Sequence, residues 1–367
     1  MVVRIIHMIG SLDIGGSQTM IMNIYRTIDR NRIQFDFIVD HSDQLYFKEE
    51  IEKLGGKVFV MPRFTGKNIF QVQKAWNCFF DAHPEYHVLH SHVRSYSSIY
   101  FPIAKKHGIK TIAHSHSTSN GSGIKSIVKI ILQYPLRYEA DYFFGCSLKA
   151  GEWLFGKKIV QSDRYFTIKN AIDTQKYFFN RKQRSILRNQ LRIEEDVTVF
   201  IHVGRLHEAK NHIFLLHVFA MLIKEIPNSM LLLVGDGELL SEIEKQIEQL
   251  NLKSNVKMLG ARTDIPDILN AADVFLFPSK WEGLPVTVVE AQASGLPCFV
   301  SDKITKEVGI SELVKFLPID KGTQVWIDAI KETDLTRKNV IDKIIQAGFD
   351  IKKSVEWLTK FYEEING

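Results

Sequence analysis

The feature that most constrains the fold is an alternation, repeated along the whole chain, of short apolar runs with longer amphipathic stretches. The short runs are rich in Val, Ile and Phe, as expected of buried parallel strands, and the longer stretches have the spacing of crossover helices. This alternation is typical of an α/β protein built on doubly wound parallel sheets. We therefore predict that fold class for the 367-residue chain.

The apolar runs that we interpret as strands fall into two series. The first series is Val3–Met8, Phe35–Val39, Lys57–Met61, Val88–His92, Thr111–His116, Tyr142–Cys146 and Phe166–Asn170. The second series is Thr198–Val203, Ser229–Val234, Val256–Leu259, Val274–Pro278, Pro297–Val300 and Val314–Leu317. Because domains commonly contain about 150 residues, each series is predicted to form a sheet of its own.

A charged segment separates the two series. It contains few large apolar residues, which indicates a connection with one exposed helix. Its basic residues are Arg181, Lys182, Arg184, Arg188 and Arg192. We predict an N-terminal Rossmann-like domain over 1–175, then a linker over 176–196. A C-terminal Rossmann-like domain follows over 197–350, and the apolar stripe of 351–367 predicts a helix that packs back on the N-terminal domain.

Composition narrows the classes of protein that the chain can belong to. The net charge of +5 and the pI of about 8.8 favour anionic partners, but the basic residues are dispersed, so nucleic acid is not an expected partner. No stretch of about 18 residues is apolar and uncharged, and the first residues do not resemble a signal peptide, so we expect a cytoplasmic protein. Cys78, Cys146 and Cys298 are interpreted as buried thiols.

A glycine-rich turn, Gly10 to Gly16, follows the first predicted strand. In open parallel sheets, ligands bind beyond the carboxyl ends of the strands. Gly15 and Gly16 let the backbone approach a ligand, and the helix that follows offers free amides to an anion. An ordinary strand-to-helix turn is the alternative. The Gly-Lys-Ser/Thr ending of a phosphate loop is absent, which disfavours a nucleoside triphosphatase.

Two cations follow the first strand of the second series, in the loop Gly204 to Asn211. The guanidinium of Arg205 can bind phosphate oxygens in a bidentate manner, while Lys210 acts as a point charge. Together they can neutralise a diphosphate. Solvated surface cations are the alternative interpretation.

Two glutamates flank a predicted helix start in the segment Trp281 to Ala291. Glu282 lies on the loop and Glu290 on the second turn of the helix. Carboxylates accept hydrogen bonds from vicinal hydroxyls, so one can hold a ribose and the other a sugar, with a diphosphate between them. This arrangement suits a nucleotide sugar; a capping acid beside an unrelated acid is the alternative. The backbone groups at the helix start are those of Gly283, Leu284 and Pro285.

Two further turns carry weaker signals. Gly235 and Gly237 form a Gly-x-Gly turn after a strand, which is as often a simple tight turn as a ligand loop. Arg262 lies in a turn that can present backbone groups to a nucleotide base. In the same turn, Asp264 can cap the next helix ahead of Pro266.

Histidines recur in pairs at the ends of two first-domain strands. Alternation along a strand places His114 and His116 on one face, where one of them can reach a donor sugar. His90 and His92 form a similar pair. A transition-metal site is the alternative, but no acidic ligand accompanies these histidines at a recognisable spacing, so we expect no bound metal.

Taken together, these motifs resemble the retaining glycosyltransferase family 4, and within it the capsule and exopolysaccharide transferases of the EpsF or CapH type. The resemblance covers nearly the whole chain. Its motifs are Gly15-Gly16, His114-Ser115-His116, Asn170-Ala171-Ile172-Asp173, Gly204-Arg205 with Lys210, Gly235-Asp236-Gly237, and the two glutamates Glu282 and Glu290. Two positions depart from the family pattern: Ala171 replaces a glycine, and Gly283-Leu284-Pro285 replaces Phe-Gly-Leu.

The resemblance implies a GT-B fold, in which an N-terminal acceptor domain and a C-terminal donor domain face each other across a cleft. It also implies transfer from a nucleotide diphosphate sugar, UDP-linked, with retention and without a metal cofactor. The implied catalytic residues are His114, Arg205, Lys210 and Glu282. The implied substrate-binding residues are Gly15, Gly16, His116, Gly235, Gly237, Arg262, Gly283, Leu284, Pro285 and Glu290.

The roles implied by the family are specific. Arg205 and Lys210 bind the donor diphosphate, and Glu290 binds the ribose. Glu282, with the backbone amides of 283–285, binds the sugar and the distal phosphate. His114, with His116 as the other candidate, contacts the donor sugar.

The expected acceptor is a saccharide linked to polyprenyl diphosphate. Within 122–138, the stretch Ile124–Leu132 interleaves bulky apolar residues with Lys125 and Lys129. Such a helix packs either in the core or on an anionic membrane as a peripheral contact. Two other functions share this architecture: a nucleotide-sugar 2-epimerase and a non-catalytic saccharide-binding protein.

Overall fold

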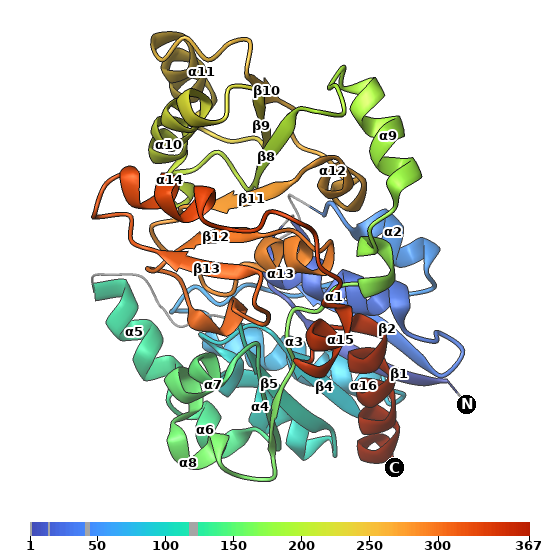
Figure 1. Cartoon of the computed structure of the whole chain (residues 1–367). Helices are drawn as coiled ribbons and strands as arrows, with labels where there is room; N and C mark the ends of the chain where they lie inside the picture. Colours follow the sequence, from blue (N-terminus) through green and yellow to red (C-terminus); the bar gives the residue numbers. More distant parts are fainter. Residues whose placement is uncertain (1, 14, 41–44, 117–123) are drawn as a thin grey trace. The chain divides into compact units, whose positions relative to one another are not determined.

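The computed structural model describes residues 2–13, 15–40, 45–116 and 124–367 (Figure 1). The chain forms two compact units. Unit 1 consists of Met1–Ala171 together with Ile351–Gly367, and unit 2 consists of Ile172–Asp350.

In the described part of the chain, unit 1 contains a seven-stranded parallel sheet in the order β3-β2-β1-β4-β5-β6-β7. The strands are β1 (Val3–Met8), β2 (Ile33–Val39), β3 (Val58–Val60), β4 (Val88–Ser91), β5 (Lys110–Ser115), β6 (Tyr142–Gly145) and β7 (Tyr165–Thr167). The helices are α1 (Gly16–Thr27), α2 (Lys48–Lys53), α3 (Ile69–Ala82), α4 (Ser97–Lys106), α5 (Ile124–Gln133), α6 (Leu136–Glu139), α7 (Leu148–Phe155), α8 (Lys157–Val160) and α16 (Ile351–Asn366).

Helices cover both faces of this sheet because alternate strand residues point to opposite sides. On β1, Ile5 belongs to the apolar cluster formed with α1 and α16, while Ile6 belongs to the cluster formed with α3 and α4. Figure 1 shows α16, in dark red, alongside α1. Arg32 and Glu363 form a bidentate ion pair at 2.9 and 2.5 Å that ties α16 to the start of β2. The C-terminal helix is therefore an integral part of unit 1.

Unit 2 contains, among its described residues, a six-stranded parallel sheet in the order β10-β9-β8-β11-β12-β13. The strands are β8 (Thr198–Val203), β9 (Ser229–Val234), β10 (Val256–Met258), β11 (Val274–Phe277), β12 (Cys298–Ser301) and β13 (Val314–Leu317). The helices are η1 (Thr174–Tyr177), α9 (Arg181–Gln190), η2 (Glu208–Lys210), α10 (His212–Glu225), α11 (Leu240–Gln249), α12 (Ile265–Ala271), α13 (Val286–Ala293), η3 (Lys306–Val308), α14 (Gln324–Lys331) and α15 (Ile341–Gln346).

The core of unit 2 also has two sides. Phe275 and Phe277 of β11 pack with α12, α13 and α15, while Val274 and Leu276 pack with α10, α11 and α14. Burying each such side chain stabilises the unit by about 1.5–3 kcal/mol. Each predicted strand has a counterpart within a few residues, and the α/β fold with two Rossmann-like parallel-sheet units is confirmed.

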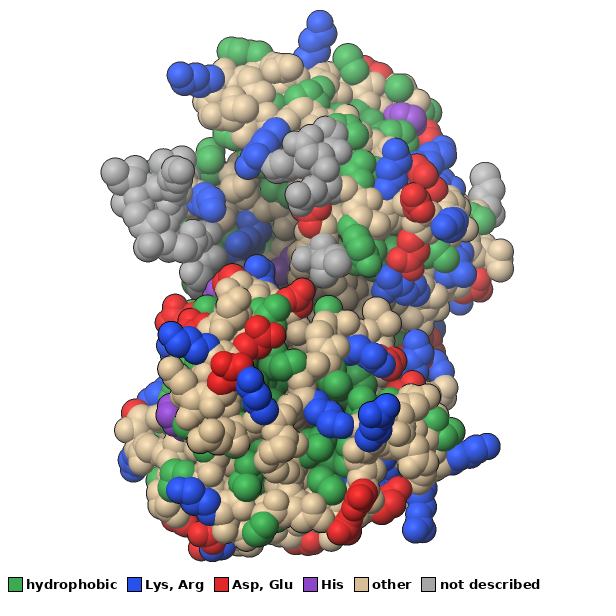
Figure 2. Space-filling view, turned by 90° about the horizontal axis from the view of Figure 1, so that it is seen from above, with side chains coloured by type: hydrophobic (Ala, Val, Ile, Leu, Met, Phe, Trp, Pro, Cys, Tyr) green, Lys and Arg blue, Asp and Glu red, His purple; other side chains and the backbone are tan. Residues whose placement is uncertain are grey.

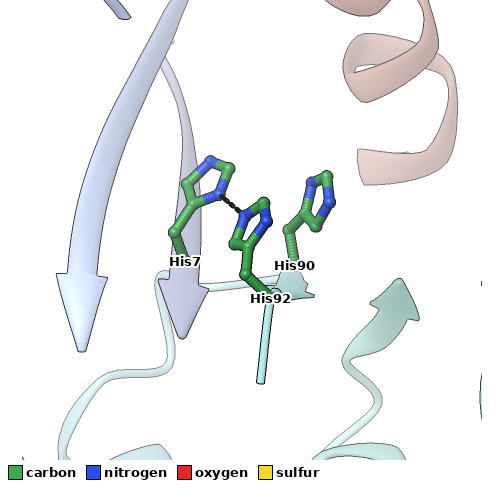
Figure 3. A group of neighbouring side chains, drawn as sticks. All are labelled: His7, His90 and His92. Atoms are coloured by element: carbon green, nitrogen blue, oxygen red, sulfur yellow. Dashed lines mark hydrogen bonds between the residues drawn. The ribbon is translucent and has the colours of Figure 1, made fainter. Parts of the chain in front are cut away.

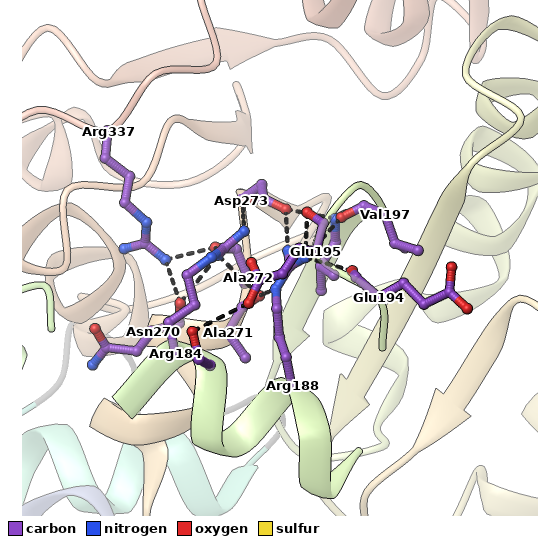
Figure 4. A network of polar contacts seen from close by, with 12 residues as sticks. Arg184, Arg188, Glu194, Glu195, Val197, Asn270, Ala271, Ala272, Asp273 and Arg337 are labelled. Atoms are coloured by element: carbon purple, nitrogen blue, oxygen red, sulfur yellow. Dashed lines mark hydrogen bonds and ion pairs between the residues drawn. The ribbon is translucent and has the colours of Figure 1, made fainter. Parts of the chain in front are cut away.

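The predicted linker belongs to unit 2, and its helix, α9, has one exposed side and one buried side. Helix α9 carries Arg188, whose side chain is fully buried and forms an ion pair with Asp273 at 2.7 Å. Arg184 reaches the other carboxylate oxygen of Asp273, also at 2.7 Å. The remaining guanidinium donors of Arg188 are satisfied by backbone carbonyls, as Figure 4 shows. These are the carbonyls of Glu194, Glu195, Val197 and Ala271. The segment 176–196 is thus built into unit 2.

A third arginine, Arg337, belongs to the C-terminal part of unit 2 and contacts the same region. Its guanidinium donates to the carbonyl of Asn270 at 3.0 Å (Figure 4). It also donates to the carbonyl of Leu269 at 2.7 Å. Burial, followed by the charge of Arg184, lowers the pKa of Arg337 to about 9. A buried cation is tolerated here because carbonyl oxygens replace the water that it loses.

The chain crosses between the units at two adjacent points. It enters unit 2 at Ile172, whose amide donates to Phe349 O at 2.9 Å, and it leaves after Asp350, whose carboxylate accepts from Thr174 Oγ1 at 2.5 Å. Ala171, which replaces the glycine of the family pattern, is buried in the core of unit 1. An apolar side chain at this position therefore adds to the packing of that core.

Two further expectations are corrected or limited by the structure. The prediction of buried thiols is wrong for Cys78, which is exposed on α3; Cys146 is partly exposed, and burial raises the pKa of Cys298. In the chain outside 1, 14, 41–44 and 117–123, no helix has the length and apolar character needed to cross a membrane. On the face shown in Figure 2, basic and acidic side chains are interspersed.

Candidate functional site

The sheet order of unit 2 places a ligand site at one point. The chain runs from β8 outward to β9 and β10, then returns to place β11 on the other side of β8. Ligands of doubly wound sheets bind at such a switch point, beyond the carboxyl ends of the two strands. The loops there are Gly204–Asn211, after β8, and Pro278–Pro285, after β11. Both contain residues that the sequence predicted.

Lys210 and Glu282 meet across these two loops. Lys210 Nζ lies 2.6 Å from Glu282 Oε1, and the two side chains are only 17% and 15% exposed. The same ammonium lies 4.8 Å from the ring centre of Phe277, the last residue of β11. A cation and an acid, both largely shielded from water, therefore neutralise each other at the centre of the switch point.

The two loops are also joined at their edge. Lys280 donates its backbone amide to Ala209 O at 2.7 Å, and its side chain pairs with Glu208 at 3.0 Å. Asn211, whose backbone lies in the left-handed region with φ +58°, donates its side-chain Nδ2 to Pro278 O at 3.2 Å. These bonds fix the position from which Lys210 projects.

Arg205 lies at the rim of the site. Its side chain is 72% exposed, and Nη2 lies 3.3 Å from Glu238 Oε2. His207 approaches the other oxygen of Glu238 at 3.5 Å. Glu238 did not emerge from the sequence, although it directly follows the Gly235 to Gly237 turn. An exposed pair of this kind separates at little cost, which leaves Arg205 able to turn to an anion.

The Gly235 to Gly237 turn has a steric reason for its glycines. A Cβ on Gly235, which has φ +143°, would stand 2.0 Å from the carbonyl oxygen of Gly204, and one on Gly237 would stand 2.5 Å from that of Leu206. Leu206 N donates to Asp236 O at 2.9 Å. The turn therefore supports the cationic loop from behind by close backbone contact.

Glu290 is partly buried on α13 and accepts a hydrogen bond of 2.6 Å from the hydroxyl of Tyr177 on η1. Burial raises the pKa of Glu290, and the bond from Tyr177 opposes that rise. Burial and the Glu290 charge raise the pKa of Tyr177. Tyr177 was not identified from the sequence, because a tyrosine in the inter-domain segment has no pattern of its own.

The start of α13 is formed by Gly283, Leu284 and Pro285, with Pro285 at the cap position. Gly283 is exposed, and a Cβ built on it would meet nothing within 4 Å. Space alone therefore does not require a glycine there. Backbone N–H groups just before and at the start of a helix have no intrahelical partner. Those of Gly283 and Leu284 are therefore available to an anionic ligand, whereas Pro285 has no N–H.

Arg262 and Asp264, after β10, form a bidentate ion pair at 2.8 and 2.6 Å. Asp264 occupies the cap position of α12, yet its side chain makes no capping bond. The predicted capping role is therefore wrong, because the guanidinium of Arg262 takes both carboxylate oxygens.

Unit 1 has its own switch point, between β1 and β4, and a cavity of about 700 Å³ opens there. Gly10, with φ +57°, turns the chain at the end of β1, and Tyr96 donates a short hydrogen bond to Asp40. The cavity is lined by residues that include Ser11, Ser17, Gln18, Arg63, Phe64, His92 and Lys129. Gly15 is the cap residue of α1 and Gly16 its first residue. A Cβ on Gly15 would stand 2.6 Å from Gln18 Oε1, the end of a flexible side chain, whereas one on Gly16 would meet nothing within 4 Å, so close packing does not require a glycine at Gly16.

The predicted histidines gather beside this switch point. His92 Nδ1 lies 2.7 Å from His116 Nε2, and His90 Nε2 lies 3.1 Å from His114 Nδ1. His7, which was not predicted as part of this group, joins it because it pairs in register with His90. Burial lowers the pKa of His7 and of His116 to about 3, and it lowers the pKa of His90, His92 and His114 well below the ordinary value. All these imidazoles are therefore neutral at physiological pH.

The structure thus distributes the predicted residues between two places. Lys210 and Glu282 are in contact, with Arg205 and Glu290 on neighbouring elements of unit 2. His114 and His116 lie in unit 1, with their ring centres 4.0 Å apart.

Comparisons with known proteins find matches for both halves of the chain. Residues 14–176 match the model described as Glycosyltransferase Family 4, and residues 183–332 match that described as Glycosyl transferases group 1. EpsF of Bacillus subtilis (strain 168), named as a glycosyltransferase, is 32% identical over 98% of this chain and 96% of its own length.

Two other similar proteins are informative. A UDP-Gal:alpha-D-GlcNAc-diphosphoundecaprenol alpha-1,3-galactosyltransferase of Escherichia coli is 34% identical, over 53% of each chain. The crystal structure of Anabaena HepE in complex with UDP has a TM-score of 0.70 and 20% identity, covering 99% of this chain and 97% of that one. At that identity the likeness concerns the fold alone.

Proposed function

Because this chain belongs to the glycosyltransferases of family 4 and group 1, we propose that it transfers a sugar from a nucleotide diphosphate donor to a saccharide acceptor. Capsular polysaccharide biosynthesis is the process named for a Staphylococcus aureus relative, and we extend polysaccharide biosynthesis to this chain. The finer elements of the proposal are a UDP-linked donor, retention at the anomeric carbon, a lipid-linked acceptor and catalysis without a metal.

The observation that carries the proposal is the Lys210–Glu282 pair at the switch point of unit 2. These two groups neutralise each other at 2.6 Å, mostly out of contact with water. A donor that brings a diphosphate and sugar hydroxyls can replace both halves of this contact at once. Lys210 would turn to the phosphate, and Glu282 would accept from the hydroxyls. A simple anion would compensate only the lysine and leave Glu282 buried and unpaired.

Arg205 would complete the diphosphate site from the rim. Charge accumulates on the leaving diphosphate as the glycosidic bond breaks, so cations that contact it stabilise the transition state more than the ground state. In front-face transfer, the acceptor hydroxyl attacks the anomeric carbon and the leaving diphosphate takes its proton. The protein then needs no carboxylate nucleophile, and Glu282 acts by positioning the sugar.

Glu290 would bind the ribose of the nucleotide. Its second oxygen can accept from a ribose hydroxyl while Tyr177 holds the first at 2.6 Å. The turn of Arg262 would lie against the base, and the backbone of 283–285 against the distal phosphate. We keep His114, with His116 as the other candidate, as the residue proposed to contact the donor sugar.

The unit 1 cavity is the proposed acceptor site. It combines cations (Arg63 and Lys129), apolar side chains (Phe64 and Leu132) and hydroxyl groups, which suits a saccharide carried on a lipid diphosphate. The acceptor named for the Escherichia coli relative is of that class.

A peripheral contact with the inner face of the cell membrane would bring the chain to such an acceptor. On α5, Ile130 and Ile131 are 52% and 65% exposed. Their replacement together by Asn should abolish flotation with anionic liposomes, because apolar groups at an interface supply the affinity. Phe70→Asn, at an 82% exposed site on α3, is the matched control. Equal flotation of all three proteins would reject the membrane contact.

The donor is tested by a thermal-shift screen against nucleotide sugars, followed by product analysis. A bound donor at 100 times its Kd should stabilise the protein by about 2.7 kcal/mol. Sugar should then appear on an added lipid-diphosphate saccharide. Release of free nucleoside diphosphate and an isomerised sugar, with no acceptor present, would instead identify an epimerase.

A further inference from the structure

Imidazole side chains from β1 and from the end of β4 come together on one face of the unit 1 sheet. Figure 3 shows His7 on β1 beside His90 and His92, with the rings close to one another. One ring nitrogen from each of the three lies within 4.8 Å of the others, and His7 Nδ1 stands 3.0 Å from His92 Nε2. Three nitrogen donors therefore converge on one small volume.

This volume is hollow and shielded from water. A cavity of about 10 Å³ is lined by His7, His90 and His92, by His114 and Tyr362, and by apolar side chains. Such a volume holds about one water-sized sphere. His7 and His90 are only 2% and 3% exposed. An ion in this cavity would therefore be held by imidazole nitrogens with little competition from bulk water.

The outer nitrogens of the His90 and His92 rings are already held. His90 Nδ1 lies 2.7 Å from the hydroxyl of Tyr362 on α16, and His92 Nδ1 lies 2.7 Å from His116 Nε2. Metal-ligating histidines are usually fixed in this way through the ring nitrogen that faces away from the ion. His90 Nε2 lies 3.1 Å from His114 Nδ1, a contact that a bound ion would replace.

We propose that His7, His90 and His92 bind a transition metal ion of borderline softness, in the first place Zn²⁺. Tetrahedral Zn²⁺ with Zn–N bonds of about 2.0–2.1 Å places its ligand nitrogens about 3.3 Å apart, close to the spacing of His7 and His92. An all-imidazole set favours Zn²⁺, Cu²⁺ and Ni²⁺ over Mg²⁺ and Ca²⁺, which prefer oxygen.

The access route agrees with this proposal. His92 also lines the 700 Å³ cavity, which gives an ion a path from solvent and leaves its fourth position for water. The ion would hold β1 to β4 and, through Tyr362, to α16. It goes beyond the proposed sugar transfer, which uses no metal.

A second group, His92, His114 and His116, also has its nitrogens within 4.8 Å. One observation favours the first group. The small cavity is lined by all three of its members, whereas His116 is not among the described residues that line it. His92 is shared, so its replacement removes both groups, while His7 and His116 distinguish them.

The test uses the full chain without a polyhistidine tag, stripped with a chelator and titrated with Co²⁺ and with Zn²⁺. We expect one ion per chain, with the visible d–d bands of tetrahedral Co²⁺, and displacement of Co²⁺ by Zn²⁺. His7→Gln and His92→Gln should weaken Zn²⁺ by ~100-fold or more, since even the loss of a ligand's hydrogen-bond partner costs about 10–100-fold. His87→Gln, at an exposed site beside β4, is the matched control and should change the affinity less than threefold.

Three outcomes would overturn the proposal: no saturable binding, full affinity in His92→Gln, or loss of binding in His116→Gln with none in His7→Gln. Circular dichroism and urea denaturation report whether a variant is folded. If the variants fail to fold, X-ray absorption of the Zn²⁺-loaded parent decides, since it should show about three imidazole nitrogens at about 2.0–2.1 Å. A shell of water oxygens alone would contradict the assignment.

Discussion

The two units have the same topology at their switch points, yet the chemistry there is opposite. In unit 2, the loops after β8 and β11 hold a lysine, an arginine and acids, with Lys210 and Glu282 in direct contact. In unit 1, the region after β1 and β4 holds an open cavity beside neutral imidazoles. A doubly wound sheet fixes where a ligand binds, and the loops alone decide which ligand it is.

The difference concerns how each region balances its charge. Unit 2 shields an ammonium and a carboxylate from water by pairing them. Both groups can then bind a ligand that carries phosphate as well as hydroxyl groups. Unit 1 removes charge instead, because burial leaves its histidines unprotonated. On this account, catalysis of diphosphate departure belongs to unit 2.

The largest effect should come from Lys210→Ala. Loss of a cation proposed to contact the leaving diphosphate should lower kcat by about 100- to 1,000-fold, as removal of a single oxyanion donor does. Steady-state turnover with the donor identified by screening measures it. Lys331→Ala is the matched control, since Lys331 forms an exposed ion pair with Glu225 elsewhere in unit 2. If Lys210→Ala kept a turnover within threefold of the parent, the assignment of diphosphate departure to unit 2 would be wrong.

Arg205→Ala should lower kcat by about 100-fold with little change in the free energy of unfolding. Its partner Glu238 is exposed, and surface ion pairs contribute about 0–1 kcal/mol. Comparing kcat with urea denaturation separates the two effects. Lys303→Ala, which breaks an exposed pair with Asp320 elsewhere in unit 2, should leave both quantities nearly unchanged. A stability loss in proportion to the loss of turnover would contradict a role in catalysis.

Glu290→Gln should weaken donor binding by about 10- to 100-fold, because a hydrogen bond to a charged group contributes about 1.5–3 kcal/mol. Calorimetry with the nucleoside diphosphate measures it. The same substitution should stabilise unit 2 at neutral pH, because it removes a carboxylate that the fold disfavours.

The pH dependence of that stabilisation has a definite sign. Burial raises the pKa of Glu290 above its ordinary value of 4.5, so folding favours the protonated form. The parent therefore loses stability as the pH rises from about 4.5 through the raised pKa, and Glu290→Gln does not. The stability gap between variant and parent should be small at pH 4 and larger at pH 7. A gap that shrinks over this interval would show that Glu290 is stabilising as a carboxylate.

The last prediction concerns stability rather than turnover, and its cause is steric. It is made for the turn behind the cationic loop. Gly235→Ala should destabilise the protein by about 1–3 kcal/mol, because its Cβ would collide with the Gly204 carbonyl at a φ that side chains rarely adopt. Gly283→Ala, in open space, should lie within about 0.5 kcal/mol of the parent. Equal stability of the two variants in urea would refute this explanation of the turn.

The sequence was sufficient where the signal is local. Apolar runs mark strands, and the residues that follow strands form the switch-point loops, so Lys210 and Glu282 were found without any knowledge of their contact. Contacts between residues far apart in the sequence could not be predicted in this way. His7 enters the histidine group only through the register of β1 with β4, and Arg188 is buried because Asp273, 85 residues away, completes its charge. An arginine-rich helix read in isolation therefore looks exposed.

The most direct test of the account is a crystal structure of the chain with an intact or non-hydrolysable nucleotide sugar. The account predicts diphosphate oxygens within about 3 Å of Lys210 Nζ and of the Arg205 guanidinium, a ribose hydroxyl on Glu290, and Glu282 released from Lys210 to the sugar. A donor bound elsewhere, with the Lys210–Glu282 contact still closed, would contradict it.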